Sequence, residues 1–265
     1  MKTQEQLGAN FRALHEGEPF VIPNPWDVGS AKVFAGLGFQ ALATTSSGFA
    51  YTLGLHDGGP GLERVLEHVA AIAEATELPV SVDLENGHGP DPEDAAAAIR
   101  GAAEAGAVGG SIEDFDPDQG LYEVGRATER VAAAVEAARG LGFEFTLTAR
   151  AENHIRGNPD LDDTIARLQA YEGAGADVLY APGLRSVEEI RAVSEATSLP
   201  LNVHSRPKLS MAEIASAGGT RVSVGGSLAF VAVAAMAAAA QRIRDEGDFS
   251  ALAVSLPDGF ADWLD

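Results

Sequence analysis

The chain alternates short apolar runs with helix-like segments from residue 20 to near its end, and this alternation constrains the fold most strongly. Predicted strands lie near residues 20–22, 39–44, 80–84, 109–112, 143–149, 178–180, 201–204 and 221–224. Predicted helices follow them. The first ends near residue 37, and the others lie near residues 62–75, 92–105, 124–138, 161–172, 187–196, 211–217 and 228–245. Glycines such as Gly106 and Gly175 stand between a helix and the next strand, where they favour helix termination. Apolar strands separated by helices indicate a parallel sheet covered by helices.

About eight such units fit into 265 residues without a linker or a change in composition. We therefore expect one domain spanning residues 1–265 with an α/β fold, a (β/α)₈ TIM-type barrel. A doubly wound open sheet is the alternative, but the first strand is not followed by Gly-x-Gly-x-x-Gly. The apolar run Ser227–Ala240 belongs to the last predicted helix, which either packs on a neighbouring subunit or covers the same barrel.

Composition excludes several classes of function. The formal net charge of −21 opposes binding to nucleic acids and to anionic membranes. The chain has no cysteine, so it has no disulfide, thiolate metal site or cysteine nucleophile. The run Ser227–Ala240 is short and dominated by alanine, whereas a membrane span needs about 20 apolar residues. Residues 1–10 lack an apolar signal segment, and we expect a cytoplasmic protein.

Polar residues gather where the predicted strands end, which is where (β/α)₈ barrels place their chemistry. The candidates for a site are Trp26, Ser46, Ser47, Gly48, Asp83, Glu85, Glu113, Asp114, Arg150, Asn202 and His204. Asp83 and Glu85 stand two apart at the end of a strand, so we expect them to point to the same side. Acids crowded at neighbouring strand ends need a proton or a cation between them, and a hard cation such as Mg²⁺ prefers oxygen ligands.

Other candidates have both a functional and a structural interpretation. Arg150 either captures a substrate carboxylate or phosphate or neutralises Glu113 or Glu152 in a structural ion pair. Ser46, Ser47 and Gly48 form either an anion-binding turn or a simple polar turn. His204 is either an acid/base group or a hydrogen-bonding wall.

Taken together, these residues resemble the isocitrate lyase/phosphoenolpyruvate mutase superfamily over nearly the whole chain. The resemblance rests on Asp83-x-Glu85-x-Gly87-x-Gly89, Ile112-Glu113-Asp114, Thr148-Ala149-Arg150, Ser46-Ser47-Gly48, Asp57, Leu201-Asn202-Val203 and Val222-Ser223-Val224-Gly225. It implies a (β/α)₈ barrel that forms a homodimer or homotetramer, with the last helix packed on a neighbour.

The resemblance also implies chemistry on small 2-oxo or 2-hydroxy acids through an enolate. Mg²⁺, with Mn²⁺ as a substitute, would be bound directly by Asp83 and through waters by Glu85, Glu113 and Asp57. The substrate would contact Arg150 and the Ser46–Gly48 turn, and by their strand-end positions we add Trp26, Asp83 and Asn202.

The loop from Phe115 to Tyr122 departs from the superfamily pattern. It lacks the Lys-x-Cys-Gly-His sequence of the isocitrate and methylisocitrate lyases, and Phe115 replaces the lysine that follows Glu-Asp in the mutases. Arg150, Glu113, Tyr122 and His204 are the predicted catalytic residues, with Tyr122 or His204 as proton donor. We expect a Mg²⁺-dependent lyase or decarboxylase that cleaves a C–C bond in a small 2-oxo or 2-hydroxy (di)carboxylic acid. The alternatives are a C–P bond enzyme and a 2-oxo-acid-binding barrel with little catalysis.

Overall fold

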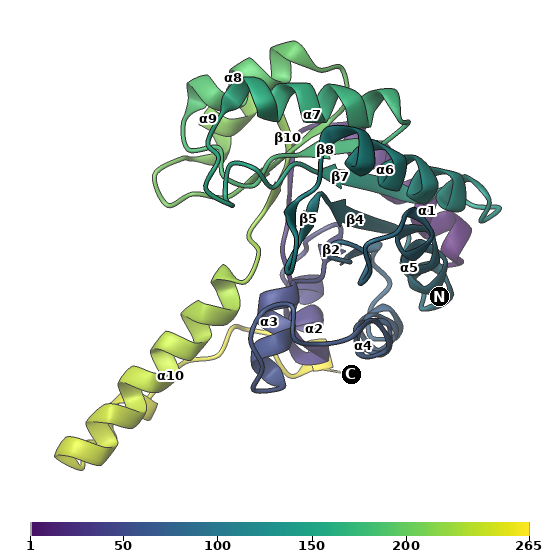
Figure 1. Ribbon diagram of the computed structural model, residues 1–265. Helices are drawn as coiled ribbons and strands as arrows, with labels where there is room; N and C mark the ends of the chain where they lie inside the picture. Colours follow the sequence, from purple (N-terminus) through teal and green to yellow (C-terminus); the bar gives the residue numbers. More distant parts are fainter. Residues whose placement is uncertain (1, 265) are drawn as a thin grey trace.

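The strands of the protein form a parallel barrel in a computed structural model, which describes residues 2–264 (Figure 1). Within these residues, eight strands follow one another in the order β1, β10, β9, β8, β7, β4, β3 and β2. Their bounds are β1 Phe20–Ile22, β2 Leu42–Ala43, β3 Val80–Asp83, β4 Gly109–Glu113, β7 Thr146–Arg150, β8 Val178–Tyr180, β9 Leu201–His204 and β10 Gly219–Ser223. This order is sequential around the barrel, so the helices between consecutive barrel strands connect neighbouring parallel strands.

The barrel closes between its first and second strands. On one side β1 pairs with β10, with Phe20 opposite Arg221. On the other side the N–H of Ala43 in β2 donates to the carbonyl of Pro23 just after β1, at 3.0 Å. Asn24 joins both seams, because its Nδ2 donates to the carbonyl of Thr44 while its Oδ1 accepts the N–H groups of residues 224 and 225. The predicted (β/α)₈ barrel is confirmed, and the open-sheet alternative is wrong.

Helices cover the outside of the barrel. Their bounds are α1 Gln4–His15, α2 Val28–Gly36, α3 Ser46–Thr52, α4 Leu62–Glu74, α5 Pro92–Glu104, α6 Val124–Arg139, α7 Leu161–Gly173, α8 Val187–Ala196, α9 Met211–Ser216 and α10 Ser227–Glu246. The core lies between these helices and the strands, and its members include Val82, Ile112, Leu147 and Leu179. Small buried residues on α5, such as Ala95 and Ala102, let helices approach the barrel closely.

Helix α1 was not predicted from the sequence. Its side chains are mostly polar, but Leu7, Phe11 and Leu14 share one face, and a capping box of Thr3 and Gln6 begins the helix. Phe11 is fully buried and packs with Phe20, Ile22 and Val108. The helix therefore lies against the part of the barrel where the strands begin.

Two other segments differ from the expected loops. Ser46, Ser47 and Gly48 form the first turn of α3 rather than a separate polar turn, because Thr45 caps this helix by accepting from the N–H of Gly48. The segment from Phe115 to Tyr122 contains an antiparallel hairpin, β5 Phe115–Asp116 with β6 Gly120–Leu121.

Helix α10 extends away from the barrel, and the chain after it returns toward α2 (Figure 1). Trp263, in the short 3₁₀-helix η2 Asp262–Leu264, lies against Gly36 of α2; a second, η1 Ser250–Leu252, precedes it. Phe230, Val231 and Met236 of α10 are about half exposed or more. The helix therefore does not cover its own barrel, which excludes that alternative.

By length and composition, α10 could cross a membrane. It has 20 residues, of which an 18-residue window is apolar with few charges, and it is the one such helix among residues 2–264. Alanine, a weak hydrophobe, dominates it. Only 6% of its apolar window is buried, so it differs from the buried core helix of a soluble protein, which passes the same test.

Candidate active site

A cavity of about 390 Å³ opens where the barrel strands end. Seven of the residues predicted for the site line it, and these are Ser46, Ser47, Asp57, Asp83, Arg150, Asn202 and His204. The other predicted residues stand outside this lining, and these are Trp26, Gly48, Glu85, Glu113, Asp114 and Tyr122. Most of the residues selected from the sequence therefore line one cavity at the strand ends.

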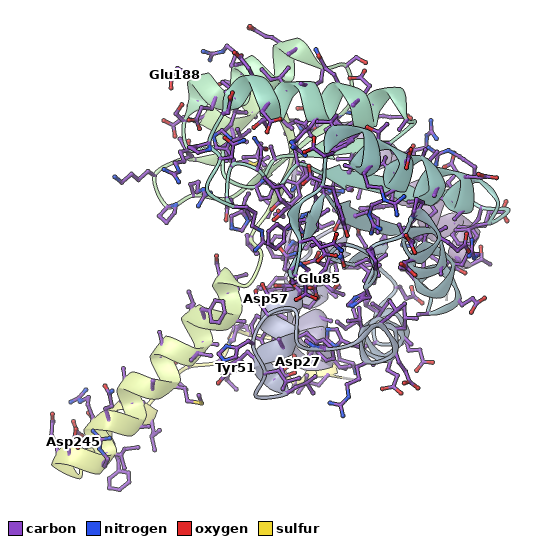
Figure 2. All side chains as sticks on the ribbon, in the orientation of Figure 1. Asp27, Tyr51, Asp57, Glu85, Glu188 and Asp245 are labelled. Carbon is purple, nitrogen blue, oxygen red and sulfur yellow. The ribbon has the colours of Figure 1, made fainter. Side chains whose placement is uncertain are left out.

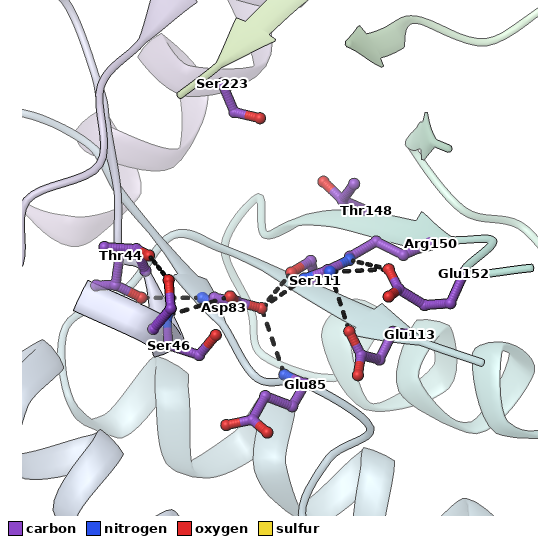
Figure 3. A network of polar contacts seen from close by, with 12 residues as sticks. Thr44, Ser46, Asp83, Glu85, Ser111, Glu113, Thr148, Arg150, Glu152 and Ser223 are labelled. Atoms are coloured by element: carbon purple, nitrogen blue, oxygen red, sulfur yellow. Dashed lines mark hydrogen bonds and ion pairs between the residues drawn. The ribbon is translucent and has the colours of Figure 1, made fainter. Parts of the chain in front are cut away.

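Arg150 occupies the centre of a buried ion-pair network (Figure 3). Its Nη1 lies 2.7 Å from Oδ1 of Asp83, its Nη2 lies 3.0 Å from Oε2 of Glu113, and its Nε donates to Oε1 of Glu152 at 3.0 Å. The Arg150 side chain is 13% exposed and that of Glu152 is fully buried. The predicted structural role of Arg150 is thus present, and the residue also lines the cavity.

A second arginine reaches the same acids from the loop after β7. Arg156 lies 3.6 Å from Oε1 of Glu113 and 3.3 Å from Oε2 of Glu152. Its guanidinium also lies 3.8 Å from the centre of the Phe115 ring. Phe115 thus holds the arginine by a cation–π contact at the point where the sequence departs from its relatives.

The acids outnumber the arginines in this network. The carboxylates are those of Asp83, Glu85, Glu113 and Glu152, and the guanidinium groups are those of Arg150 and Arg156. With every group ionised, four negative charges face two positive ones. Burial raises the pKa of Glu113 well above its usual range, against the opposing effect of Arg150. A proton or a further cation in the site would therefore reduce this excess of negative charge.

Glu85 does not share a strand face with Asp83. Strand β3 ends at Asp83, and Glu85 adopts a left-handed backbone with φ of 51°. The expectation that the two acids point to the same side of a strand is wrong, because a strand's alternation of sides ends with the strand. Glu85 lines a neighbouring hollow of about 520 Å³ instead. A left-handed non-glycine residue is uncommon and marks a position held by its surroundings.

Glu85 nevertheless remains electrostatically close to the site. Burial raises its pKa to about 7, and the negative charges of Asp83 and Asp57 raise it further. Figure 2 shows Asp57 and Glu85 near one another on the side of the barrel toward α3. The three acids repel one another in the absence of a cation.

The first turn of α3 faces Asp83. The N–H of Ser46 donates to Oδ2 of Asp83 at 3.3 Å, and Ser111 Oγ donates to Oδ1 at 3.4 Å. Gly48 lies behind this turn, where an added Cβ would come within 2.6 Å of Thr45 and 3.0 Å of Trp26. Gly48 and Trp26 therefore shape the helix start rather than the cavity wall.

The two predicted proton donors have different surroundings. His204 lines the cavity, its Nδ1 is buried with no partner among the described residues, and burial lowers its pKa to about 4. Tyr122 donates to Oδ2 of Asp116 at 3.0 Å, and its ring lies under the guanidinium of Arg130. Tyr122 thus belongs to a network outside the cavity lining, whereas His204 meets the cavity as a neutral imidazole.

Sequence reasoning missed several residues of the site. These are Ser111, Arg156, Tyr180, Arg206 and Arg221. Tyr180 ends β8 and Arg206 follows the end of β9 by two residues, so the strand-end signal was available for both. Arg221 lies within β10, where a polar side chain carries no local sign that it points into the barrel.

The oxygen-rich site fits a hard divalent cation in its chemistry. Oδ2 of Asp83 accepts only the long bond from Ser46, so it has lone pairs available at the cavity. Within residues 2–264, no three His, Cys, Asp or Glu side chains converge closely enough to hold an ion by themselves. The expected arrangement, with Asp83 as direct ligand and the other acids acting through water, does not need such convergence and stays a prediction.

The chain is similar to known proteins both in sequence and in structure. The family model described as phosphoenolpyruvate phosphomutase matches residues 11–244. A candidate lyase/mutase from Burkholderia cenocepacia J2315 has a crystal structure that is 49% identical, with a TM-score of 0.95, covering 98% of this chain and 96% of that one. The 2-methylisocitrate lyase of Halalkalibacterium halodurans is 29% identical over 93% of this chain and 85% of its own.

More distant solved structures differ in their reactions. Oxaloacetate acetylhydrolase in complex with its product oxalate is 26% identical, with a TM-score of 0.87, over 100% of this chain and 95% of that one. 2,3-Dimethylmalate lyase and phosphonopyruvate hydrolase, the latter in complex with oxalate and Mg²⁺, are each 25% identical. The predicted superfamily is confirmed, and its reactions extend beyond one bond type.

Proposed function

Because the chain belongs to the phosphoenolpyruvate phosphomutase family, within the isocitrate lyase/phosphoenolpyruvate mutase superfamily, we propose that it is a Mg²⁺-dependent carbon–carbon lyase or decarboxylase. Its substrate is a small 2-oxo or 2-hydroxy acid, most simply a dicarboxylate, and the reaction passes through an enolate. The observation that carries the proposal is the Asp83–Arg150–Glu113 network, which lies at the edge of a cavity lined by hydroxyls, arginines and apolar side chains.

Each part of the site has a distinct task in this proposal. Asp83, assisted by Glu85, Glu113 and Asp57 through water, would hold the cation. When bound, the cation supplies Lewis-acid stabilisation of negative charge on the substrate's α-oxygen. The N-terminal turn of α3, at Ser46 and Ser47, would present its serine hydroxyls to a substrate carboxylate.

Arg150 organises the acids in this scheme and borders the substrate. Because it is bound to three carboxylates, little of its charge is left for a second anionic group. Arg206 is better placed for that group, since it lines the cavity and its Nε donates only to the carbonyl of Leu184, at 3.4 Å. A dicarboxylate would thus lie between the acidic cluster and Arg206.

The proton donor to the enolate must reach the cavity. His204 and Tyr180 both line it, whereas the hydroxyl of Tyr122 is bound to Asp116. Tyr180 lies beneath Arg150, with 5.2 Å between guanidinium and ring centre. We favour Tyr180 or a water held by His204 over Tyr122.

The exposed apolar face of α10 supports a homodimer or homotetramer. Burying a Phe, Val or Met side chain stabilises by about 1.5–3 kcal/mol, and α10 leaves Phe230, Val231 and Met236 largely exposed. A neighbouring subunit is the simplest cover in a cytoplasmic enzyme. Phe230 also lines the cavity, so the same helix borders the site.

The comparisons also favour one second candidate, a C–P bond enzyme. The matching family model is a phosphomutase, and phosphonopyruvate hydrolase is among the solved relatives. Phe115 stands where mutases carry lysine, which ranks this candidate second. Conversion of phosphonopyruvate, followed by phosphorus NMR, would distinguish it from the first.

The proposal is tested by turnover of oxaloacetate, malate-type and citrate-type acids with Mg²⁺, before and after chelation. We expect C–C cleavage of one of these acids, lost on chelation and in Asp83→Ala. Glu188→Gln, which changes an exposed acid on α8, is the matched control and should retain full activity. Turnover that survives both chelation and Asp83→Ala would refute the metal assignment. Binding of 2-oxo acids without turnover of any compound would favour a binding barrel.

A further inference from the structure

Arg221 is a buried cation whose hydrogen-bonding partners are all neutral. Its Nε donates to Oδ1 of Asn202 at 2.8 Å, and its Nη2 donates to Oγ1 of Thr148 at 2.9 Å. Its Nη1 lies 3.1 Å from Nε2 of His15. Among residues 2–264, no carboxylate lies within ion-pair distance of this guanidinium. Arg221 is 5% exposed, so water does not compensate its charge.

His15 is held in the form that accepts from Arg221. Its Nδ1 lies 2.8 Å from the carbonyl oxygen of Phe11, which can only accept, so Nδ1 carries the proton and donates. In the neutral ring Nε2 then accepts from Arg221. Burial, followed by the charge of Arg221, lowers the pKa of His15 to about 3, so the ring stays neutral. Helix α1 thus supports Arg221 without neutralising it.

Two other buried arginines, Arg150 and Arg130, differ from Arg221 because carboxylates lie near them. Arg150 lies against three carboxylates. The buried Arg130 ends on the main-chain carbonyls of Asn86 and Asp91 and has the carboxylates of Asp94 and Asp116 nearby. Arg221 has no such acid, and yet it lines the cavity of the candidate site.

The position of Arg221 is at the floor of that cavity. It lies on β10, and its three partners come from α1, β7 and β9. His15 belongs to a separate hollow at the opposite end of the barrel. A guanidinium has five N–H donors, and the three contacts use one each, so two remain for a ligand or a bridging water.

Resting on the proposed function, we propose that Arg221 is an anion-binding residue, which adds from the cavity floor a positive charge to that of Arg206 and so complements a dianionic substrate. The acidic cluster holds the cation side of the site, and Arg150 is already balanced by it. The uncompensated charge of Arg221 becomes paired when an anion enters the cavity. His15 acts as a positioning residue, which keeps the guanidinium directed across the barrel.

The test compares two ligands of similar size and different charge, oxalate and oxamate, in the presence of Mg²⁺. Their affinities are measured by calorimetry for the wild type, Arg221→Gln and Arg221→Lys. Because a hydrogen bond to a charged group contributes more than a neutral one, Arg221→Gln should weaken oxalate binding roughly 10- to 100-fold, and oxamate binding much less. Arg221→Lys retains the charge and should keep the oxalate preference of the wild type.

A merely structural role makes a different prediction. In that case Arg221→Gln would lower the melting temperature and leave the ratio of the two affinities unchanged, which would overturn the proposal. If Arg221→Gln does not fold, a crystal structure of the wild type with Mg²⁺ and oxalate decides. A ligand oxygen, or one bridging water, on a free N–H of Arg221 supports the proposal, and a ligand with neither refutes it. These binding readouts need no turnover, so they remain informative if the proposed lyase activity is not found.

Discussion

Nη1 of Arg150, at the end of β7, lies 2.7 Å from Oδ1 of Asp83, at the end of β3, although 67 residues separate them along the chain. The same guanidinium also holds Glu113 and the fully buried Glu152. One arginine thus fixes the relative positions of three strand ends, and the proposed metal ligand Asp83 is among the groups it positions (Figure 3).

Replacing Arg150 with Met should therefore affect both stability and activity. Breaking a buried ion pair by removing one partner costs about 3–5 kcal/mol, because the remaining charge stays buried, and here Glu152 would be left inside the barrel. Urea denaturation measures the loss. Arg156→Met, whose side chain is 36% exposed, is the comparison and should cost clearly less. Equal losses for the two variants would contradict the central role of Arg150.

Asn24→Ala should weaken the seam where the barrel closes. The Asn24 side chain makes three hydrogen bonds to backbone groups on either side of β1, and it is 5% exposed. At about 1 kcal/mol each, their loss lowers the free energy of unfolding by about 3 kcal/mol. Asn158→Ala, which removes an amide from an exposed loop, is the control and should have little effect. A stability for Asn24→Ala close to that of the control would show that the seam does not depend on this residue.

Stability should fall in acid partly because of His15. In the folded protein its pKa is lowered from 6.5 to about 3, mainly by burial. As the pH falls through 6.5 the unfolded chain binds a proton that the folded chain does not bind, so stability is full above 6.5 and is lost between 6.5 and about 3. One proton corresponds to a slope of at most about 1.4 kcal/mol per pH unit.

His15→Gln tests this pH dependence, because a neutral amide oxygen can still accept from Arg221 without titrating. The variant should show a shallower dependence of unfolding free energy on pH over that interval. Burial also lowers the pKa values of His68 and His204 to about 4, and both remain in the variant, so only the difference between the two curves reports on His15. Parallel curves would show that His15 does not contribute.

Charge placed on α10 should dissociate the proposed oligomer. Val231 and Met236 are 63% and 59% exposed, and the double variant Val231→Asp/Met236→Glu puts two carboxylates on this apolar surface. Light scattering should show a smaller assembly than the wild type. Ala132→Glu, on the exposed side of α6, adds charge to a helix of the barrel and should leave the mass unchanged. A wild-type protein that is already monomeric would refute the proposed assembly.

The fold could be predicted because its signals are local. Short apolar strands and glycine helix stops recur along the chain, and each can be recognised within a dozen residues. The helices that were not predicted have weak local signals. Helix α1 is largely polar. The Ser/Thr-rich start of α3 resembles a polar turn in sequence, and only the structure shows that Thr45 caps a helix there. The exposure of α10 follows from how the chain leaves the barrel after β10, which no local pattern encodes.

The site was predictable only in outline. Strand ends located Asp83, Arg150, Asn202 and His204 at the cavity, because parallel strands in a barrel end on one side. The same reasoning placed Glu85 on a strand that had already ended. Tyr122, which was chosen as a proton donor from its place in the loop after β4, has its hydroxyl bound to Asp116. Side-chain direction depends on the backbone angles of the turn, and these are set by contacts with neighbouring loops.

The sequence by itself determined the barrel, the superfamily and the side of the barrel where polar groups gather, since all of these depend on residue types in chain order. Only the tertiary structure decided which charges are paired. Arg150 and Arg221 are both arginines on barrel strands, yet the first contacts three acids and the second contacts only neutral groups, including His15, 206 residues away. The physical reason is that electrostatic pairing depends on distances across the barrel, and these exist only once the strands have closed.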